Sequence, residues 1–256
     1  MTLARWAAEL AEVARHAGAE ILKIYDSDFT TYRKADRSPV TDADLAAEAV
    51  ILPALRRLAP DILIISEEDS HASGLPTQAP DRFWLVDPLD GTKEFVARNG
   101  EFTVNIALVE HGRPVLGIVH VPVLGQTYRS YGDVAESATD GSSFKPIRAR
   151  VTPAEGATLI ISRSHADKEM VKVEELGERV AGTIVAGSSV KFCRIAEGVA
   201  DLYPRLGPTM EWDTAAGHAV LEAAGGSVRT LEGETLRYGK VGFRNPHFVA
   251  RGPRHG

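Results

Sequence analysis

The sequence predicts a mixed α/β protein (α/β or α+β class), in which helices and sheets form layers. The first 25 residues repeat apolar side chains at three- and four-residue steps, which is the period of an amphipathic helix. Residues 102–109 alternate polar and apolar side chains, as a strand with one face in the core does. Beyond residue 157, strand-like and helix-like patterns alternate, which is typical of a layered α/β unit.

The N-terminal quarter is predicted to hold two helices. The helix over residues 1–25 is followed by the polar stretch 26–38, which is long for a connection and is typical of a functional lid. A second helix starts at Thr41 or Asp42, either of which suits an N-cap, and runs towards Leu58. Pro53 makes the middle of this helix uncertain, because proline removes a helical hydrogen bond.

Strand patterns dominate the next segment. Short apolar runs at 62–65 and 83–86 each end in acidic residues. Residues 102–109 and 115–123 flank Glu-His-Gly-Arg at 110–113, a sequence that predicts a hairpin.

A weakly patterned stretch over residues 131–156 is the best candidate for a domain boundary. We therefore expect an N-terminal α+β domain over residues 1–150 and a C-terminal α/β domain over residues 151–256. The elements predicted for the second domain are strands at 158–161, 183–186 and 201–204, helices at 167–180, 189–198 and 214–224, and further short strands.

Composition excludes several classes of function. The 29 basic against 35 acidic residues give a net charge of −6, which argues against a nucleic-acid partner. Cys193 is the single cysteine, so no internal disulfide can form; we interpret it as a small buried hydrophobic residue. No run approaches the ~20 apolar residues of a membrane span. We expect a cytoplasmic protein, either monomer or homodimer, with peripheral contact to the inner membrane left open.

Carboxylates gather at the ends of predicted elements: Glu67 and Glu68 after one strand, Asp87 and Asp90 after the next, and Asp213 before a helix. Any single acid of this kind is usually an ordinary cap or turn residue. Two acids in one tight turn, however, repel each other unless a cation lies between them. Carboxylate oxygens select Mg²⁺, Mn²⁺ or Ca²⁺ rather than zinc, and the spacing is not that of an EF-hand.

Bound divalent cations would convert this acidic cluster into a template for phosphate and would activate water. Two predicted helix starts, at Thr92 and Ala215, can also direct backbone N–H groups at phosphate oxygens. No residue resembles a phosphoryl acceptor. The pattern therefore predicts phosphomonoester hydrolysis by direct attack of water.

Three motifs resemble the lithium-sensitive inositol monophosphatase superfamily of metal-dependent phosphatases. They are Ser-Glu-Glu-Asp at 66–69, Trp-Leu-Val-Asp-Pro-Leu-Asp-Gly-Thr at 84–92 and Glu-Trp-Asp-Thr-Ala-Ala-Gly at 211–217. The resemblance spans nearly the whole chain and implies a layered α/β/α/β/α sandwich. It also implies two or three Mg²⁺ ions per site, with Mn²⁺ as a substitute and Li⁺ as an inhibitor.

Within that superfamily the chain is most similar to the CysQ-type 3'(2'),5'-bisphosphate nucleotidases. Thr-Lys-Glu-Phe at 92–95, Gly-Ser-Ser-Val-Lys-Phe at 187–192 and Asp-Leu-Tyr-Pro-Arg at 201–205 carry this similarity. Inositol monophosphatases typically have Asn at the position of Glu94. The resemblance implies hydrolysis of the 3'-phosphate of adenosine 3',5'-bisphosphate to AMP and phosphate, an activity linked to sulfate assimilation.

The resemblance also implies a role for individual residues. Thr92, paired with Asp44, would orient the attacking water, with Glu67 counted as the third catalytic residue, and Glu68 would support the site. The implied metal ligands are Glu67, Asp87, Leu89 through its carbonyl, Asp90 and Asp213. The implied substrate-binding residues are Gly91, Thr92, His165, Ser188, Lys191, Arg205 and Asp213.

Two alternatives remain beside the nucleotidase. An inositol or other sugar monophosphatase would use the same chemistry in a different pocket, and Lys93 with the basic residues Lys191 and Arg205 disfavours it. A non-catalytic metal-binding homologue is disfavoured by Thr92 and Asp44, since a metal cage needs neither. Lys191 and Arg205 also have an ordinary interpretation as solvated surface charges.

Overall fold

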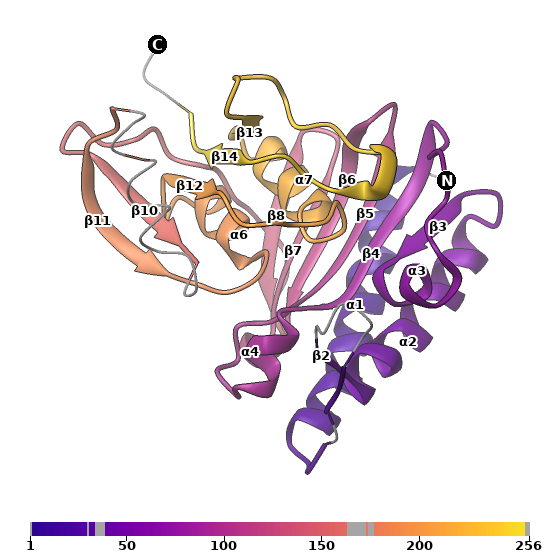
Figure 1. Ribbon diagram of the computed structural model, residues 1–256. Helices are drawn as coiled ribbons and strands as arrows, with labels where there is room; N and C mark the ends of the chain where they lie inside the picture. The colour runs from indigo at the N-terminus through magenta and orange to yellow at the C-terminus, as the bar shows by residue number, and fades with distance from the viewer. Residues whose placement is uncertain (1, 30, 34–38, 163–172, 174–176, 254–256) are drawn as a thin grey trace.

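The fold was determined as a computed structural model that describes residues 2–29, 31–33, 39–162, 173 and 177–253. Its layers are a helix pair, a seven-stranded sheet, a second helix pair and a five-stranded sheet, which confirms the predicted mixed α/β class (Figure 1). The helices are α1 Leu3–Tyr25, α2 Asp42–Leu58, α3 Glu67–Ser73, α4 Thr92–Val96, α6 Val190–Ala196 and α7 Ala215–Ala223, with 3₁₀ turns η1 Pro122–Leu124 and η2 Val241–Phe243.

The larger sheet has the order β3-β4-β5-β6-β7-β8-β9, with β3 and β4 parallel and all other neighbours antiparallel. Two of its strands, β8 and β9, lie in the weakly patterned stretch, so the sheet continues to Pro146. Its strands are β3 Leu63–Ser66, β4 Arg82–Asp90, β5 Thr103–Glu110, β6 Arg113–Val121, β7 Gln126–Tyr131, β8 Val134–Thr139 and β9 Lys145–Pro146.

The smaller sheet has the order β11-β10-β12-β14-β13 and mixes parallel and antiparallel pairs. The helix expected at 167–180 falls mostly outside the described residues. The same is true of most of the last helical layer of the expected α/β/α/β/α sandwich, to which this helix would belong. The strands are β10 Ala157–Ile161, β11 Val180–Val185, β12 Leu202–Arg205, β13 Ser227–Thr230 and β14 Phe248–Arg251; a separate ribbon pairs β1 Thr31–Arg33 with β2 Pro39–Thr41.

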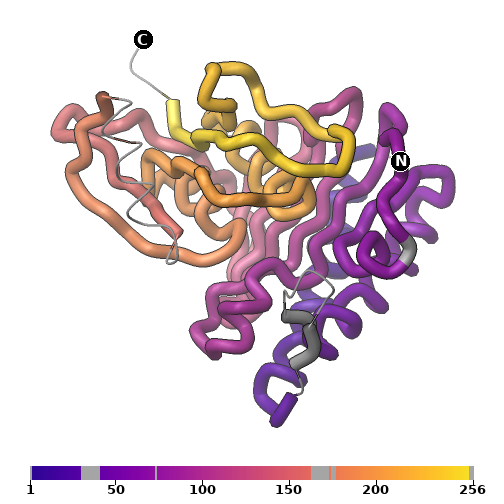
Figure 2. The backbone as a smooth tube through the Cα atoms, in the orientation of Figure 1, coloured from indigo at the N-terminus to yellow at the C-terminus, as the bar shows by residue number. Residues whose placement is uncertain are grey.

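Helices α1 and α2 cover one face of the larger sheet, and the C-terminal half of the chain covers the other (Figure 2). The apolar stripe of α1 is buried as predicted, and Trp6 packs on Trp84 of β4 at 5.5 Å between ring centroids. Helix α2 runs through Pro53 without interruption. The Pro53 side chain is exposed, so water can satisfy the carbonyl that loses its helical partner.

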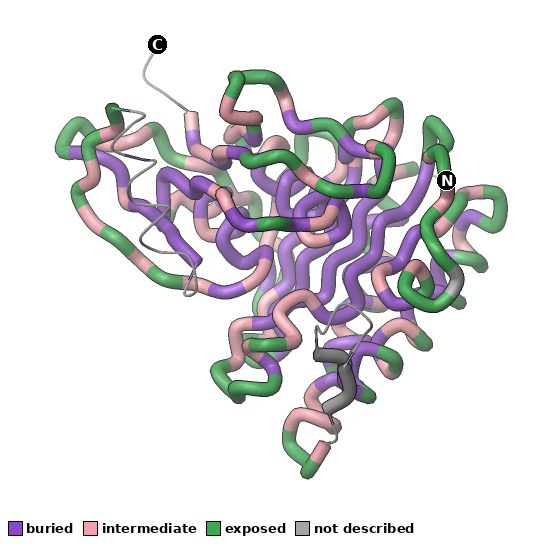
Figure 3. Tube along the Cα trace, viewed as in Figure 1, coloured by how far each residue is buried: buried purple, intermediate pink, exposed green. Residues whose placement is uncertain are grey.

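The predicted hairpin is present as β5 and β6, joined by His111 and Gly112, which both have positive φ (49° and 75°) as this tight turn requires. The expectation that β5 is half-buried was wrong: Thr103 to Val109 are all buried (Figure 3). Helices pack on both faces of this sheet, so the polar face of β5 lies inside the protein. Cys193 is fully buried, as predicted.

No helix of the described residues is both long enough and apolar enough to cross a bilayer.

Candidate active site

The parallel pairing of β3 with β4 brings two acids together. Ser66 pairs with Val86, so the next residues, Glu67 and Asp87, lie side by side; Glu67 directly follows the end of β3, and Asp87 lies within β4. Glu67 opens helix α3 directly after its N-cap Ser66, whereas Asp87 stays in β4 and is buried. The Ser66 hydroxyl donates a hydrogen bond to Glu48 of α2, which ties this turn to the helix layer.

The tight turn expected from Asp87 to Thr92 is instead an extension of β4. The strand continues to Asp90 through an irregularity that places one extra residue opposite β5, because Asp87 pairs with Asn105 and Asp90 with Thr103. Proline has no N–H for the ladder, so Pro88 suits a bulge of this kind. The bulge moves the two carboxylates into different surroundings.

Asp213 completes the acidic cluster from the other half of the chain. It precedes α7, and its Oδ2 accepts a hydrogen bond from the backbone N–H of Met210 at 2.9 Å. One carboxylate oxygen each of Glu67, Asp87 and Asp213 lies within 4.8 Å of the others. Three segments that are far apart in the sequence therefore meet in one hard-oxygen site, as the motifs predicted.

The electrostatics of this cluster fit a cation. Burial raises the pKa of Asp213 well above its usual range, and the neighbouring Asp90 and Glu67 raise it further. Burial also raises the pKa of Asp90, to about 6. Repulsion between these carboxylates is relieved either by protonation, which the raised pKa values favour, or by positive charge, which a divalent cation supplies.

Asp90 is held by a polar network that sequence analysis missed. Its Oδ2 accepts hydrogen bonds from the backbone N–H of Ser189 at 2.7 Å and from the Ser189 hydroxyl at 3.1 Å. The Ser189 hydroxyl oxygen also lies 2.8 Å from Oδ1 of Asn105, so these two acceptors share its one proton, and the Asn105 amide donates to Asp90 at 3.4 Å. Asn105 inside an apolar strand was the available signal; Ser189 lies in the 187–192 motif, but nothing in that motif indicated a contact with Asp90.

Thr92, Asp44 and Leu89 meet at the start of α4. The Thr92 hydroxyl lies 3.3 Å from Oδ1 of Asp44 and 3.4 Å from the carbonyl oxygen of Leu89. Asp44 is itself fixed, because its Oδ2 accepts hydrogen bonds from the backbone N–H and hydroxyl of Thr41 in the capping box of α2. Gly91 precedes Thr92 with φ +97°, a conformation that favours glycine.

Glu68 is buried beside Glu67 but lies outside the group of three carboxylates. It lines neither of the two cavities described next.

Two adjoining cavities share six residues in their walls: Asp90, Gly91, Lys93, Glu94, Thr209 and Asp213. The acidic cavity, about 400 Å³, also contains Glu67, Asp87, Leu89, Thr92 and Arg244. The basic cavity, about 160 Å³, also contains Ser162, Ser188, Lys191, Tyr203 and Arg205. All five expected metal ligands thus line the acidic cavity, and two of them, Asp90 and Asp213, also line the basic one; Ser188, Lys191 and Arg205 line the basic cavity alone.

Lys191 and Arg205 are not solvated surface charges. Lys191 is 4% exposed, donates to the carbonyl oxygen of Ser188 at 2.7 Å and lies 5.2 Å from the Tyr203 ring. Arg205 is half-buried and donates to the Ser162 hydroxyl at 2.9 Å. His165, the remaining residue of this group, lies outside the described part of the chain.

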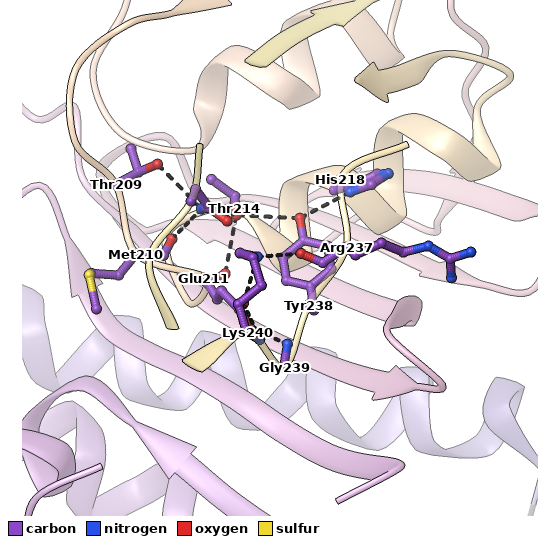
Figure 4. Close-up of polar contacts among 10 residues, drawn as sticks. Thr209, Met210, Glu211, Thr214, His218, Arg237, Tyr238, Gly239 and Lys240 are labelled. Carbon is purple, nitrogen blue, oxygen red and sulfur yellow. Dashed lines mark hydrogen bonds and ion pairs between the residues drawn. The ribbon is translucent and has the colours of Figure 1, made fainter. Parts of the chain in front are cut away.

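A buried network supports the Asp213 segment from behind (Figure 4). The Glu211 carboxylate accepts from the backbone N–H groups of Gly239 (2.6 Å) and Lys240 (3.0 Å) and forms an ion pair with the Lys240 ammonium at 2.6 Å. Thr214 and Tyr238 extend the network to His218, whose Nδ1 lies 3.0 Å from the Tyr238 hydroxyl. This network joins the C-terminal segment to the acidic cluster.

The fold and the acidic cluster define a family. The chain matches the Inositol monophosphatase family over residues 3–252, and it belongs to that family.

Within this family, the chain is similar to curated proteins that share one name. The 3'(2'),5'-bisphosphate nucleotidase CysQ of Shigella flexneri is 49% identical over 249 residues, which cover 94% of this chain and 97% of that protein. The enzyme of the same name from Escherichia coli K12 is 47% identical with the same coverage.

Solved structures agree with this result. CysQ from Bacteroides thetaiotaomicron, described as a bacterial member of the inositol monophosphatase family, superposes with a TM-score of 0.77 at 37% identity and covers 97% of this chain and 96% of its own. An inositol monophosphatase from Zymomonas mobilis superposes with a TM-score of 0.74 at 29% identity and covers 96% of this chain and 91% of its own.

Proposed function

We propose that this protein is a Mg²⁺-dependent phosphatase that removes the 3'-phosphate of adenosine 3',5'-bisphosphate and releases AMP. The observation that carries the proposal is the pairing of the two cavities: an acidic one suited to cations and a basic one beside it. A substrate with two phosphates matches this pairing, because one phosphate can lie at each cavity. The relatives named 3'(2'),5'-bisphosphate nucleotidase CysQ support a bisphosphate substrate, and the link to sulfate assimilation is part of the proposal.

The residues that would hold the metal ions are Glu67, Asp87, Asp213, Asp90 and the carbonyl of Leu89, an all-oxygen set that suits Mg²⁺ and tolerates Mn²⁺. When bound, two or three such ions would neutralise the phosphate and lower the pKa of water. We expect Li⁺ to inhibit.

Thr92 and Asp44 would orient the attacking water. A threonine hydroxyl that donates its proton to Asp44 presents its lone pairs to a water molecule at the acidic cavity. Because Asp44 is held by the backbone and side chain of Thr41, this acceptor is fixed before substrate binds.

The second phosphate would bind in the basic cavity. The Lys191 ammonium and the Arg205 guanidinium both line it, and Ser188 adds a hydroxyl. The cavity wall also includes Tyr203, a ring on which a base or ribose could pack. We further propose that His165 borders the nucleoside.

Phosphate release from adenosine 3',5'-bisphosphate and from inositol 1-phosphate, each with Mg²⁺, tests the proposal. We expect kcat/KM to favour the bisphosphate. A preference for inositol 1-phosphate would assign the sugar monophosphatase alternative, and no turnover of either substrate would favour a non-catalytic metal-binding homologue.

Lys191→Met tests the position of the second phosphate, because it removes the charge while keeping the length of a buried side chain. We expect KM to rise about tenfold or more for adenosine 3',5'-bisphosphate, as loss of a charge-assisted hydrogen bond would predict. KM for a monophosphate substrate such as inositol 1-phosphate should change much less. Equal losses on both substrates would show that Lys191 supports the fold or the common phosphate.

A further inference from the structure

Arg244 is a basic residue in the wall of the acidic cavity, and the motifs do not include it. It follows the 3₁₀ turn η2 in extended backbone (φ −95°, ψ 136°), and its backbone pairs with Met210, three residues before Asp213. The cavity it lines contains Glu67, Asp87 and Asp213. Arg244 does not line the basic cavity that contains Lys191 and Arg205.

The residues on either side of Arg244 are anchored in the protein. Phe243 is 1% exposed and packs against the ring of Phe83, with 6.2 Å between centroids. The Asn245 amide donates to the Met210 carbonyl at 2.8 Å and to the Thr214 hydroxyl at 3.0 Å. Phe243 and Asn245 are thus both held against the protein, whereas the Arg244 side chain between them is exposed and lines the acidic cavity.

The segment that carries Arg244 is firmly joined to the metal-site segment. The backbone N–H of Glu211 donates to the Phe243 carbonyl at 2.8 Å, and that of Asn245 donates to the Thr209 carbonyl at 3.0 Å. The buried ion pair between Glu211 and Lys240 holds the start of η2 to the same segment (Figure 4). A guanidinium on such a support loses little backbone entropy on binding a ligand.

Charge identifies what Arg244 would bind. Its side chain is exposed, and within the described residues it makes no hydrogen bond or ion pair. A planar guanidinium presents a fork of N–H donors that matches two phosphate oxygens. The carboxylates of the acidic cavity are the expected metal ligands, so the anion beside Arg244 is the phosphate that those metals would hold.

We propose that Arg244 contacts the phosphoryl group that is hydrolysed, and not the second phosphate of the substrate. This inference rests on one part of the proposed function, that metal ions hold the reacting phosphate in the acidic cavity. It does not depend on which alcohol is released when that phosphate is hydrolysed. It separates Arg244 from Lys191 and Arg205, whereas Lys93 lines both cavities. Lys191 and Arg205 would select bisphosphates, and Arg244 would serve every phosphomonoester that the enzyme accepts.

The test compares Arg244→Gln and Arg244→Lys with the matched control Arg56→Gln, which removes the same charge from the exposed last turn of α2. Inorganic phosphate is the probe, used as a competitive inhibitor with Mg²⁺ present. For Arg244→Gln we expect its inhibition constant to rise about tenfold, the lower end for a charge-assisted hydrogen bond. Arg244→Lys should lie between wild type and Arg244→Gln, and Arg56→Gln should match wild type.

Two further measurements make the assignment specific. KM for adenosine 3',5'-bisphosphate and for a monophosphate should rise by the same factor in Arg244→Gln, unlike the unequal rise expected of Lys191→Met. The increase in melting temperature that phosphate produces in the presence of Mg²⁺ should shrink in Arg244→Gln, which reports binding without turnover.

An unchanged inhibition constant for phosphate would overturn the inference, and so would a KM increase confined to the bisphosphate. These outcomes are distinct from failure of the proposed function. If wild type prefers a different phosphomonoester, inorganic phosphate still tests Arg244 on its own.

Discussion

At the scale of single residues, the two aspartates of the 84–92 motif have different surroundings, although they are only three positions apart. The hydrogen bonds found for Asp90 all reach Oδ2, from Ser189, Asn105 and Thr103. Oδ1 of Asp87 instead accepts a hydrogen bond from the backbone N–H of Leu89 at 3.1 Å. The bulge in β4 separates them, so each carboxylate has its own fixed orientation before any cation binds.

Asp90→Asn should abolish turnover and leave the fold intact. The amide oxygen can still accept from Ser189, but the ligand charge is lost. Without metal, the variant should melt at or above the temperature of wild type, because a buried like charge is gone. Added Mg²⁺ should stabilise wild type more than the variant, since a ligand stabilises the state that it binds. If Asp90→Asn turns over substrate as fast as wild type at saturating Mg²⁺, Asp90 is not a metal ligand.

Thr92→Ala should lower kcat by roughly 10²–10⁴-fold, the usual contribution of a group that orients or transfers a proton. Thr92→Ser keeps the hydroxyl and should retain most of the activity. Mg²⁺ affinity, measured by calorimetry, should be similar in both variants. If Thr92→Ala only lowers the melting temperature, Thr92 is a structural residue at the start of α4 and nothing more.

At the scale of elements, the close contact of α7 with β6 sets the position of the Asp213 segment on the larger sheet. Gly117 of β6 faces this helix: a Cβ there would lie 2.4 Å from the Ala216 carbonyl oxygen and 2.8 Å from the Ala219 Cβ. Ala216 follows Asp213 by three residues. A shift of α7 away from the sheet would therefore also move a wall of the acidic cavity.

Gly117→Ala should destabilise the protein by about 1–3 kcal/mol or more, the range for overpacking a well-packed core. It should also weaken Mg²⁺ binding, because α7 must move. Gly182→Ala in β11 is the control, since a Cβ there meets no atom within 4 Å and the backbone has no positive φ. Denaturant unfolding measures the free energy of unfolding of both variants. Equal stability of the two variants would show that α7 and β6 can move apart without a loss of stability.

At the scale of the whole molecule, burial of two histidines makes stability depend on pH. Burial lowers the pKa of His120, on β6, to about 4 and that of His218, on α7, to about 3. In the unfolded chain both titrate near 6.5. Below that pH the unfolded state binds more protons, so each histidine lowers the free energy of unfolding as the pH falls from about 6.5 towards its folded pKa.

His120→Gln should therefore flatten the pH dependence of stability between pH 6 and pH 4.5. The variant lacks one of the protons that the unfolded state binds and the folded state does not. The slope of the free energy of unfolding against pH should therefore change by up to about 1.4 kcal/mol per pH unit. Urea unfolding of wild type and variant across this range gives both slopes, and the comparison cancels the contribution of the carboxylate cluster. Parallel slopes would show that His120 titrates normally in the folded protein.

Much of the fold was predictable because its signals are local. The stripe of α1, the hairpin turn at His111 and Gly112 and the N-cap of α2 each depend on side chains within a few positions of one another. The apolar runs that end at Ile65 and Val86 are also local signals, although β4 continues to Asp90, and parallel pairing brings the acids Glu67 and Asp87 together. The burial of β5 was not predictable, since it depends on helices from both halves of the chain.

The sequence alone determined the family resemblance and the acidic motifs, because carboxylates at element ends and the residues around them are contiguous in the chain. Only the tertiary structure decided that Ser189 holds Asp90 across 99 positions, that Lys191 is buried, and that Arg244 lines the acidic cavity and not the basic one. Contacts of this length depend on strand register, on the bulge in β4 and on the packing of α7. These follow from burial of the whole core and leave no periodic signal near the residues concerned.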